Sequence, residues 1–267
     1  MTTGLLLRPI SIVPSGKLSL VSDTDGPEVS SLTNSRKLRR FLDHDLGPWL
    51  LVFLLLAWQI YVAGFDATAD GGTLVRFGAR RPNFGFPQPT WRLLCSTFLH
   101  GGWIHLLSNA LLIIFWGGKL CRLLGNVAFL GVFLVAGFWG SLISDIYGPE
   151  AIAIGASGGT SGLLLAVLTM ALLNPSRERW DGEAGSWLRS SLAVVALNLV
   201  FVSGLTGGSH LQLDHWAHTG GAIAGAFLGS MACLDREGRN RALWFGVLSL
   251  VLAAVGVVSA RGSSPLG

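Results

Sequence analysis

A serine flanked by glycines is the residue in this sequence whose surroundings most favour chemistry. Ser157 lies in the stretch GASGGTSG, residues 155–162, which opens an apolar run reaching Leu173. The first backbone N–H groups of a helix have no partner inside the helix and can bind negative charge. A hydroxyl beside such donors forms half of an acyl-transfer site. The alternative without chemistry is a close contact between helices through small residues.

Three other polar side chains in apolar surroundings can complete such a site. The imidazole of His218 can take the serine proton and later return it to a leaving amine. His105 and Asn109 are four residues apart, so on a helix they point the same way and can both donate hydrogen bonds to an oxyanion. Their alternative role is to join helices through hydrogen bonds.

The composition indicates a membrane protein. Of the 267 residues, 51% are hydrophobic and only 13% are charged, against about 25% charged in soluble domains. The formal net charge of +4 comes from basic residues in short loops, so we expect no nucleic-acid binding. The three cysteines are scattered and predict neither a disulfide framework nor a metal site.

Seven apolar segments follow a polar tail of 44 residues, which we expect to be mostly disordered. Each segment is close to the roughly 20 residues that a helix needs to cross a bilayer. The predicted fold is therefore an all-α, polytopic helical bundle. The long connection 66–103 is rich in aromatic residues and is expected to fold on itself at the membrane surface. The segments are expected near residues 48–65, 104–120, 128–146, 157–173, 187–205, 215–234 and 242–260.

The distribution of basic residues predicts the orientation. With the N-terminus in the cytoplasm, 14 of the 19 lysines and arginines lie inside, as the positive-inside rule prefers. The C-terminus is then outside. The second, fourth and sixth segments all begin at the outer face, which brings His105, Asn109, Ser157 and His218 to a similar depth. Polar residues within a membrane are costly and tend to be functional.

Glycine spacing predicts which helices touch. Gly221 and Gly225 lie four residues apart on the sixth segment, and Gly158 and Gly162 do so on the fourth. Each pair forms one face without side chains, which allows close approach of the two backbones. His218 precedes Gly221 by three residues and shares its face. If the faces meet, its imidazole can reach Ser157.

Taken together, these motifs resemble the rhomboid family of intramembrane serine proteases. The resemblance implies a six-helix core, a Ser157–His218 dyad, and an oxyanion hole formed by His105, Asn109 and the Ser157 amide. It also implies cleavage of membrane proteins in or near their transmembrane segments, without metal or cofactor, and the seventh segment resembles the extra C-terminal helix of the six-plus-one subgroup. The ordered motifs are Trp91-Arg92, His105-x-x-x-Asn109, Gly155-Ala156-Ser157-Gly158 with Gly162, and Ala217-His218-x-x-Gly221-x-x-x-Gly225.

Two positions depart from the family pattern. Ser161 stands where members usually carry an aromatic residue that stacks on the catalytic histidine, so we expect Trp216 or a Ser161 hydrogen bond to hold His218 instead. Cys121 stands where a glutamate often braces the first loop or a helix end. These departures leave open a catalytically inactive rhomboid-like protein that binds the transmembrane helices of clients.

Three rival interpretations compete with a Ser–His dyad. Asp214, four residues before His218, can complete a triad, but at a helix start we expect it to cap the helix. Four histidines (His100, His105, His215 and His218) can in principle bind zinc, but the sequence has no HExxH motif to pair two ligands with a base. A transporter is the non-enzyme alternative, although the two halves show no convincing internal repeat.

The predicted organisation has three parts: a cytoplasmic tail (1–44), a six-helix rhomboid-like catalytic core (45–236), and an additional C-terminal transmembrane helix with a short tail (237–267). No transit peptide or secretory signal is recognisable, which favours a bacterial plasma membrane. The expected partners are the lipid bilayer and single-span or other membrane-protein substrates.

Overall fold

The computed structural model describes residues 46–65, 70–80, 89–148, 151–173, 186, 189–194, 196, 214–234 and 241–262. All of them belong to one compact unit, Arg39–Gly267. The tail 1–44 and most of the expected fifth segment lie outside the described residues. Within that segment, residues 189–194 are helical, and Ser191 is buried and accepts a hydrogen bond from the Trp116 indole at 3.2 Å.

Helices account for the expected apolar segments in the part of the chain that the structure describes. Five of these helices are long and apolar enough to cross a membrane, and α8, with 17 residues, is shorter. The second span is continuous and contains one wider π-helical turn, η2. The elements are α2 (Leu46–Ala63), α5 (Trp103–Leu112), η2 (Ile113–Gly117), α6 (Gly118–Leu124), α7 (Asn126–Tyr147), α8 (Ser157–Leu173), α10 (His215–Leu234) and α11 (Arg241–Gly262).

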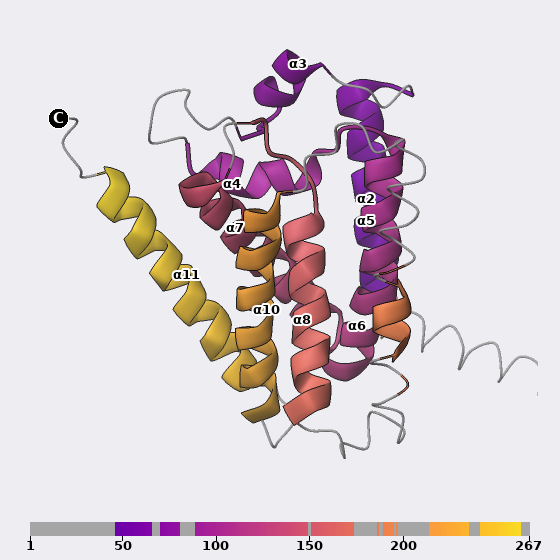
Figure 1. The fold of residues 1–267 in the computed structure, drawn as a ribbon, viewed down its shortest axis with the longest axis vertical. Coiled ribbons are helices and arrows are strands. Elements are labelled where there is room, and N and C mark those ends of the chain that lie inside the picture. Colours follow the sequence, from indigo (N-terminus) through magenta and orange to yellow (C-terminus); the bar gives the residue numbers. More distant parts are fainter. Residues whose placement is uncertain are drawn as a thin grey trace, which may run out of the picture. The chain divides into compact units, whose positions relative to one another are not determined.

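The connection between the first two spans folds on itself, as predicted. It contains α3 (Gly71–Arg76), α4 (Trp91–Cys95) and the 3-10 turn η1 (Ser96–Phe98), which lie at the end of the bundle where α8 begins (Figure 1). The Arg92 side chain donates to the carbonyls of Val75 and Ala79 at 2.6 and 2.8 Å. This arginine thereby joins α4 to the end of α3.

Helices α8 and α10 pack backbone against backbone through the predicted glycine faces, and they run side by side in Figure 1. A Cβ at Gly221 would lie 3.0 Å from the Gly158 Cα, and one at Gly225 would lie 2.5 Å from the Gly162 Cα. Both distances are shorter than an ordinary carbon–carbon contact. Only glycine therefore permits this approach, and the glycine prediction is confirmed.

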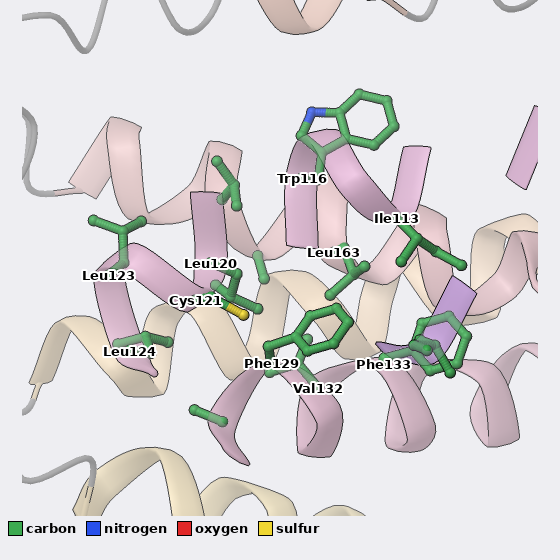
Figure 2. Close-up of a cluster of buried hydrophobic side chains, with 14 of the residues drawn as sticks. Ile113, Trp116, Leu120, Cys121, Leu123, Leu124, Phe129, Val132, Phe133 and Leu163 are labelled. Carbon is green, nitrogen blue, oxygen red and sulfur yellow. The ribbon is translucent and has the colours of Figure 1, made fainter. Parts of the chain in front are cut away.

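The main apolar core surrounds α6 and α7, and Figure 2 shows part of it. Cys121 is fully buried there, in the same cluster as Leu120 and Phe129. The position where the family often has a glutamate is thus part of an apolar core. A carboxylate there would need a buried partner to offset its desolvation.

Candidate active site

Ser157 is the first residue of α8, and the turn before it depends on Gly155. Gly155 has a φ of +122°, in a region that residues other than glycine rarely adopt. Its N–H donates to the Ser96 carbonyl at 2.9 Å, which ties the turn to η1. The serine therefore stands at the start of α8, where free N–H groups and the helix dipole both favour negative charge.

His105 of α5 lies against this turn. A Cβ built on Gly155 would be 2.7 Å from the His105 Nε2 atom and 3.9 Å from the Ser157 hydroxyl oxygen. The imidazole edge and the hydroxyl thus both lie within 4 Å of the same Cβ position. The absence of a side chain at Gly155 lets the two groups share one site.

The second ring nitrogen of His105 indicates its tautomer. The Gly101 N–H points to His105 Nδ1 at 3.5 Å, so Nδ1 acts as an acceptor. In a neutral imidazole the other nitrogen then carries the proton. This assignment places an Nε2–H donor beside Gly155.

His218 reaches the site from α10 through a three-helix contact. A Cβ at Gly140 of α7 would lie 2.6 Å from the Ala217 carbonyl and 3.2 Å from the Gly158 Cα. The residues next to His218 and Ser157 in the chain therefore meet at one point. His105 and His218 also lie close enough for their charges to interact.

Ser157 and His218 both lie in the part of the chain that the structure describes. No hydrogen bond joins the Ser157 hydroxyl to the His218 ring. The structure brings the two helix starts together without a hydrogen bond between these side chains. Catalytic hydrogen bonds are often long without substrate and tighten when it binds.

Asn109 is buried one turn after His105. Its amide donates to the His105 carbonyl at 3.0 Å, so one of its two N–H donors is used within α5. The second N–H is the group that can serve an oxyanion. The structure therefore places Asn109 beside His105.

Asp214 caps α10. Its carboxylate accepts from the Ala217 N–H at 2.9 Å and from the Ser144 hydroxyl, and its carbonyl accepts from the His218 N–H at 3.1 Å. The expectation of capping is confirmed. The carboxylate reaches the histidine through the backbone of the first turn and through its charge.

Neither expected support for His218 is present. The Trp216 ring packs on Tyr147 instead, with ring centroids 5.2 Å apart. The physical reason is the helical period, because residues two apart on a helix point to different faces. Ser161 is described, and no hydrogen bond joins its hydroxyl to His218. Both suggestions were therefore wrong.

Arg80 is a site residue that sequence reasoning missed. Its side chain is 1% exposed, and it contacts Ser144 and Asp145 of α7 and Asp214 at the start of α10. Burial lowers the pKa of Arg80, and the two carboxylates act in the opposite direction. The Asp145 side chain is only 6% exposed in this cluster. The sequence carries no signal of this burial.

His100 packs against His105 and is linked to α2 through its carbonyl. Its ring is fully buried and meets the His105 ring edge to face at 5.0 Å, while its carbonyl accepts from Gln59 of α2 at 3.0 Å. Burial and the nearby His105 lower the pKa of His100 well below its usual value. No group of three or more His, Cys, Asp or Glu side chains within the described ranges is arranged to hold a metal ion.

Comparison with known proteins is decisive for the family. Residues 87–235 match the Rhomboid domain. The chain belongs to the rhomboid family. The match spans the turn before Ser157, the α5 histidine and the start of α10. With its apolar helices, the rhomboid chain is an all-α, multi-pass integral membrane protein.

Named relatives of this rhomboid chain occur in plants, bacteria and a parasite. It is 35% identical to RHOMBOID-like protein 7 of Arabidopsis thaliana over 150 residues, 56% of this chain and 45% of that protein. It is 32% identical to Rhomboid protease GluP of Bacillus subtilis over 215 residues, 79% and 40% of the two chains. It is 28% identical to Rhomboid-like protease 1 of Toxoplasma gondii over 228 residues, 82% and 74%. The chain thus spans less than half of the plant and Bacillus proteins.

Proposed function

We propose that this rhomboid chain is an intramembrane serine endopeptidase that uses Ser157 as nucleophile and His218 as general base. The observation that carries the proposal is the meeting of three elements around one turn. The Ser157 hydroxyl and the His105 Nε2 atom both lie within 4 Å of the position of a Gly155 Cβ. The neighbour of His218, Ala217, contacts the backbone of Gly158.

In the first chemical step, His218 takes the proton of the Ser157 hydroxyl as its oxygen attacks the carbonyl carbon of the scissile peptide bond. The α8 and α10 starts must approach slightly for this transfer, and bound substrate supplies the energy for the approach. The tetrahedral intermediate then carries a negative oxygen. His218 next gives the proton to the leaving amine, and a water molecule attacks the acyl-enzyme by the same route.

We assign the oxyanion to three hydrogen-bond donors, two on α5 and one at the start of α8. His105 offers Nε2–H, Asn109 offers its second amide hydrogen, and Ser157 offers its backbone N–H at the positive end of α8. Each well-placed donor contributes about 3–4 kcal/mol to transition-state stabilisation. Apart from the attacking water, every catalytic group in this mechanism belongs to the chain, so the proposed reaction uses no metal or cofactor.

The proposed substrates are the transmembrane segments of single-span or other membrane proteins. The site lies where α8 and α10 begin, so it serves bonds near one membrane surface, where water is available. The distribution of basic residues supports a cytoplasmic N-terminus and an outer active site. We propose that the membrane is a bacterial plasma membrane. We further propose the division into a tail (1–44), a catalytic core (45–236) and an added C-terminal helix (237–267).

The test is cleavage of a single-span reporter by purified protein in liposomes. The parent should cleave the reporter, and Ser157→Ala should not. Ser161→Ala is the matched control, because it removes a hydroxyl one turn later on the same helix, and it should cleave like the parent. Equal cleavage by the parent and Ser157→Ala would refute the assignment of the nucleophile.

A second candidate function is a rhomboid-like protein that binds client helices without cutting them. The specific observation in its favour is that His218 has neither a stacked aromatic partner nor a hydrogen bond to Ser157 among the described residues. This candidate predicts that a client helix co-purifies equally with the parent and with Ser157→Ala, and that neither protein cuts it.

A further inference from the structure

Arg80 is a buried charge that the proposed mechanism does not use. Its guanidinium donates to the Ser144 hydroxyl at 2.5 Å and lies 3.4 Å from one carboxylate oxygen of Asp145 and 3.4 Å from one of Asp214. The Asp145 and Asp214 side chains are 6% and 19% exposed. One cation thus stands between two largely buried anions that come from different helices.

The backbone of Arg80 contacts the segment that leads to the serine. Arg80 and Ala153 form an isolated antiparallel bridge, with N–O distances of 3.2 and 2.9 Å. Ala153 precedes Ser157 by four residues, and Gly155 between them is fixed to Ser96. The main chain at Arg80 therefore fixes the segment that precedes Ser157.

The side chain of Arg80 contacts the helix that carries the histidine. Asp214 accepts from the guanidinium and also caps the first turn of α10 through the Ala217 N–H. The Ser144 hydroxyl bonds the same carboxylate. A displacement of Asp214 would therefore move the first turn of α10, in which His218 is the next residue after Ala217.

We infer that Arg80 is a positioning residue, which fixes the separation of Ser157 and His218 by holding the serine segment with its backbone and the α10 start with its side chain. This inference rests on the proposed function, because it assigns Arg80 to the geometry of the dyad. The Arg80 side chain holds the start of α10 through Asp214 whether or not the protein cuts peptide bonds.

The alternative is that Arg80 only stabilises the fold. Removing one partner from a buried ion pair leaves uncompensated charge and destabilises any protein. A variant without net buried charge separates the two roles. In Arg80→Met combined with Asp145→Asn and Asp214→Asn, no charge is left unpaired, and asparagine still caps a helix as well as aspartate does.

The first experiment measures kcat and KM for the reporter beside thermal stability. Arg80→Met should lose about 100-fold or more in kcat with KM nearly unchanged, the size expected for misplacement of about 1 Å. Arg80→Lys, which keeps the charge but contacts fewer partners, should recover part of kcat. The neutral triple variant should regain thermal stability while kcat stays low. Arg76→Met, at an exposed arginine of the same loop, is the matched control and should behave like the parent.

Parental kcat in Arg80→Met, or kcat that returns together with stability in the triple variant, would overturn the inference.

The second experiment does not depend on activity. Hydrogen exchange of residues 215–218 should accelerate in Arg80→Met, while exchange in the middle of α10 stays unchanged. If the parent cleaves nothing, the proposed function fails. Hydrogen exchange alone then tests whether Arg80 holds the first turn of α10. Unchanged exchange at 215–218 would also overturn the inference.

Discussion

Alanine at Gly221 adds one methyl group at the contact between α8 and α10. The new Cβ would lie 3.0 Å from the Gly158 Cα and 2.7 Å from the Gly158 carbonyl carbon. Ordinary contacts of a Cβ are 3.4–4 Å, and both neighbours are backbone atoms that cannot rotate away. The helices must therefore separate by about 1 Å, because packed interiors have no free volume to absorb the methyl group. Gly158 adjoins Ser157, so the separation also widens the gap to His218.

The magnitude follows from two effects. Overpacking of this kind destabilises a protein by about 1–3 kcal/mol, whereas misplacing catalytic groups by about 1 Å costs about 100-fold in rate. Gly221→Ala should therefore retain its fold and lose about 100-fold in kcat. Gly221→Leu should abolish activity, although it removes no catalytic group.

The assay is reporter cleavage in liposomes, with thermal unfolding measured on the same samples. Gly256→Ala on α11 is the matched control, because no atom lies within 4 Å of a Cβ at Gly256. The control should keep the parental rate and stability. Full activity in Gly221→Ala, or an equal loss in Gly256→Ala, would refute the packing argument.

Three further predictions follow from the site. Gly155→Ala should abolish both cleavage and serine labelling, because φ is +122° and the new Cβ would meet His105 at 2.7 Å; normal labelling would contradict this. Since burial lowers the pKa of His100, the unfolded chain alone takes up that proton, and stability should fall as pH drops below about 6.5, by at most about 1.4 kcal/mol per pH unit; a parental slope in thermal melts of His100→Leu between pH 7 and 5 would contradict it. Cleavage should survive EDTA and 1,10-phenanthroline, whereas loss restored by zinc would favour a metal site.

The parts of the site that were predictable lie on regular helices. The spacing of Gly221 and Gly225, and of Gly158 and Gly162, defines one face on each of two helices whatever the rest of the chain does. Short loops then alternate the helix direction, which brings Ser157 and His218 to the same end of the bundle. Local periodicity and topology were sufficient for this contact.

The missed features depend on partners far away in the sequence. Arg80 is buried against Ser144 and Asp214, which lie 64 and 134 positions further on and accept hydrogen bonds from its guanidinium. No local pattern announces such a charge. The expectation for Trp216 was wrong for a local reason. The helical period places its ring on a different face from His218, where it packs on Tyr147.

The most direct test of the central claim is fluorophosphonate labelling of the purified protein, with the modified residue identified by mass spectrometry. A serine activated by His218 reacts with the reagent without any substrate. We expect modification of Ser157 in the parent, and its loss in a His218→Gln variant whose thermal stability is unchanged. An unmodified Ser157 in folded parent protein, or equal labelling in His218→Gln, would contradict it.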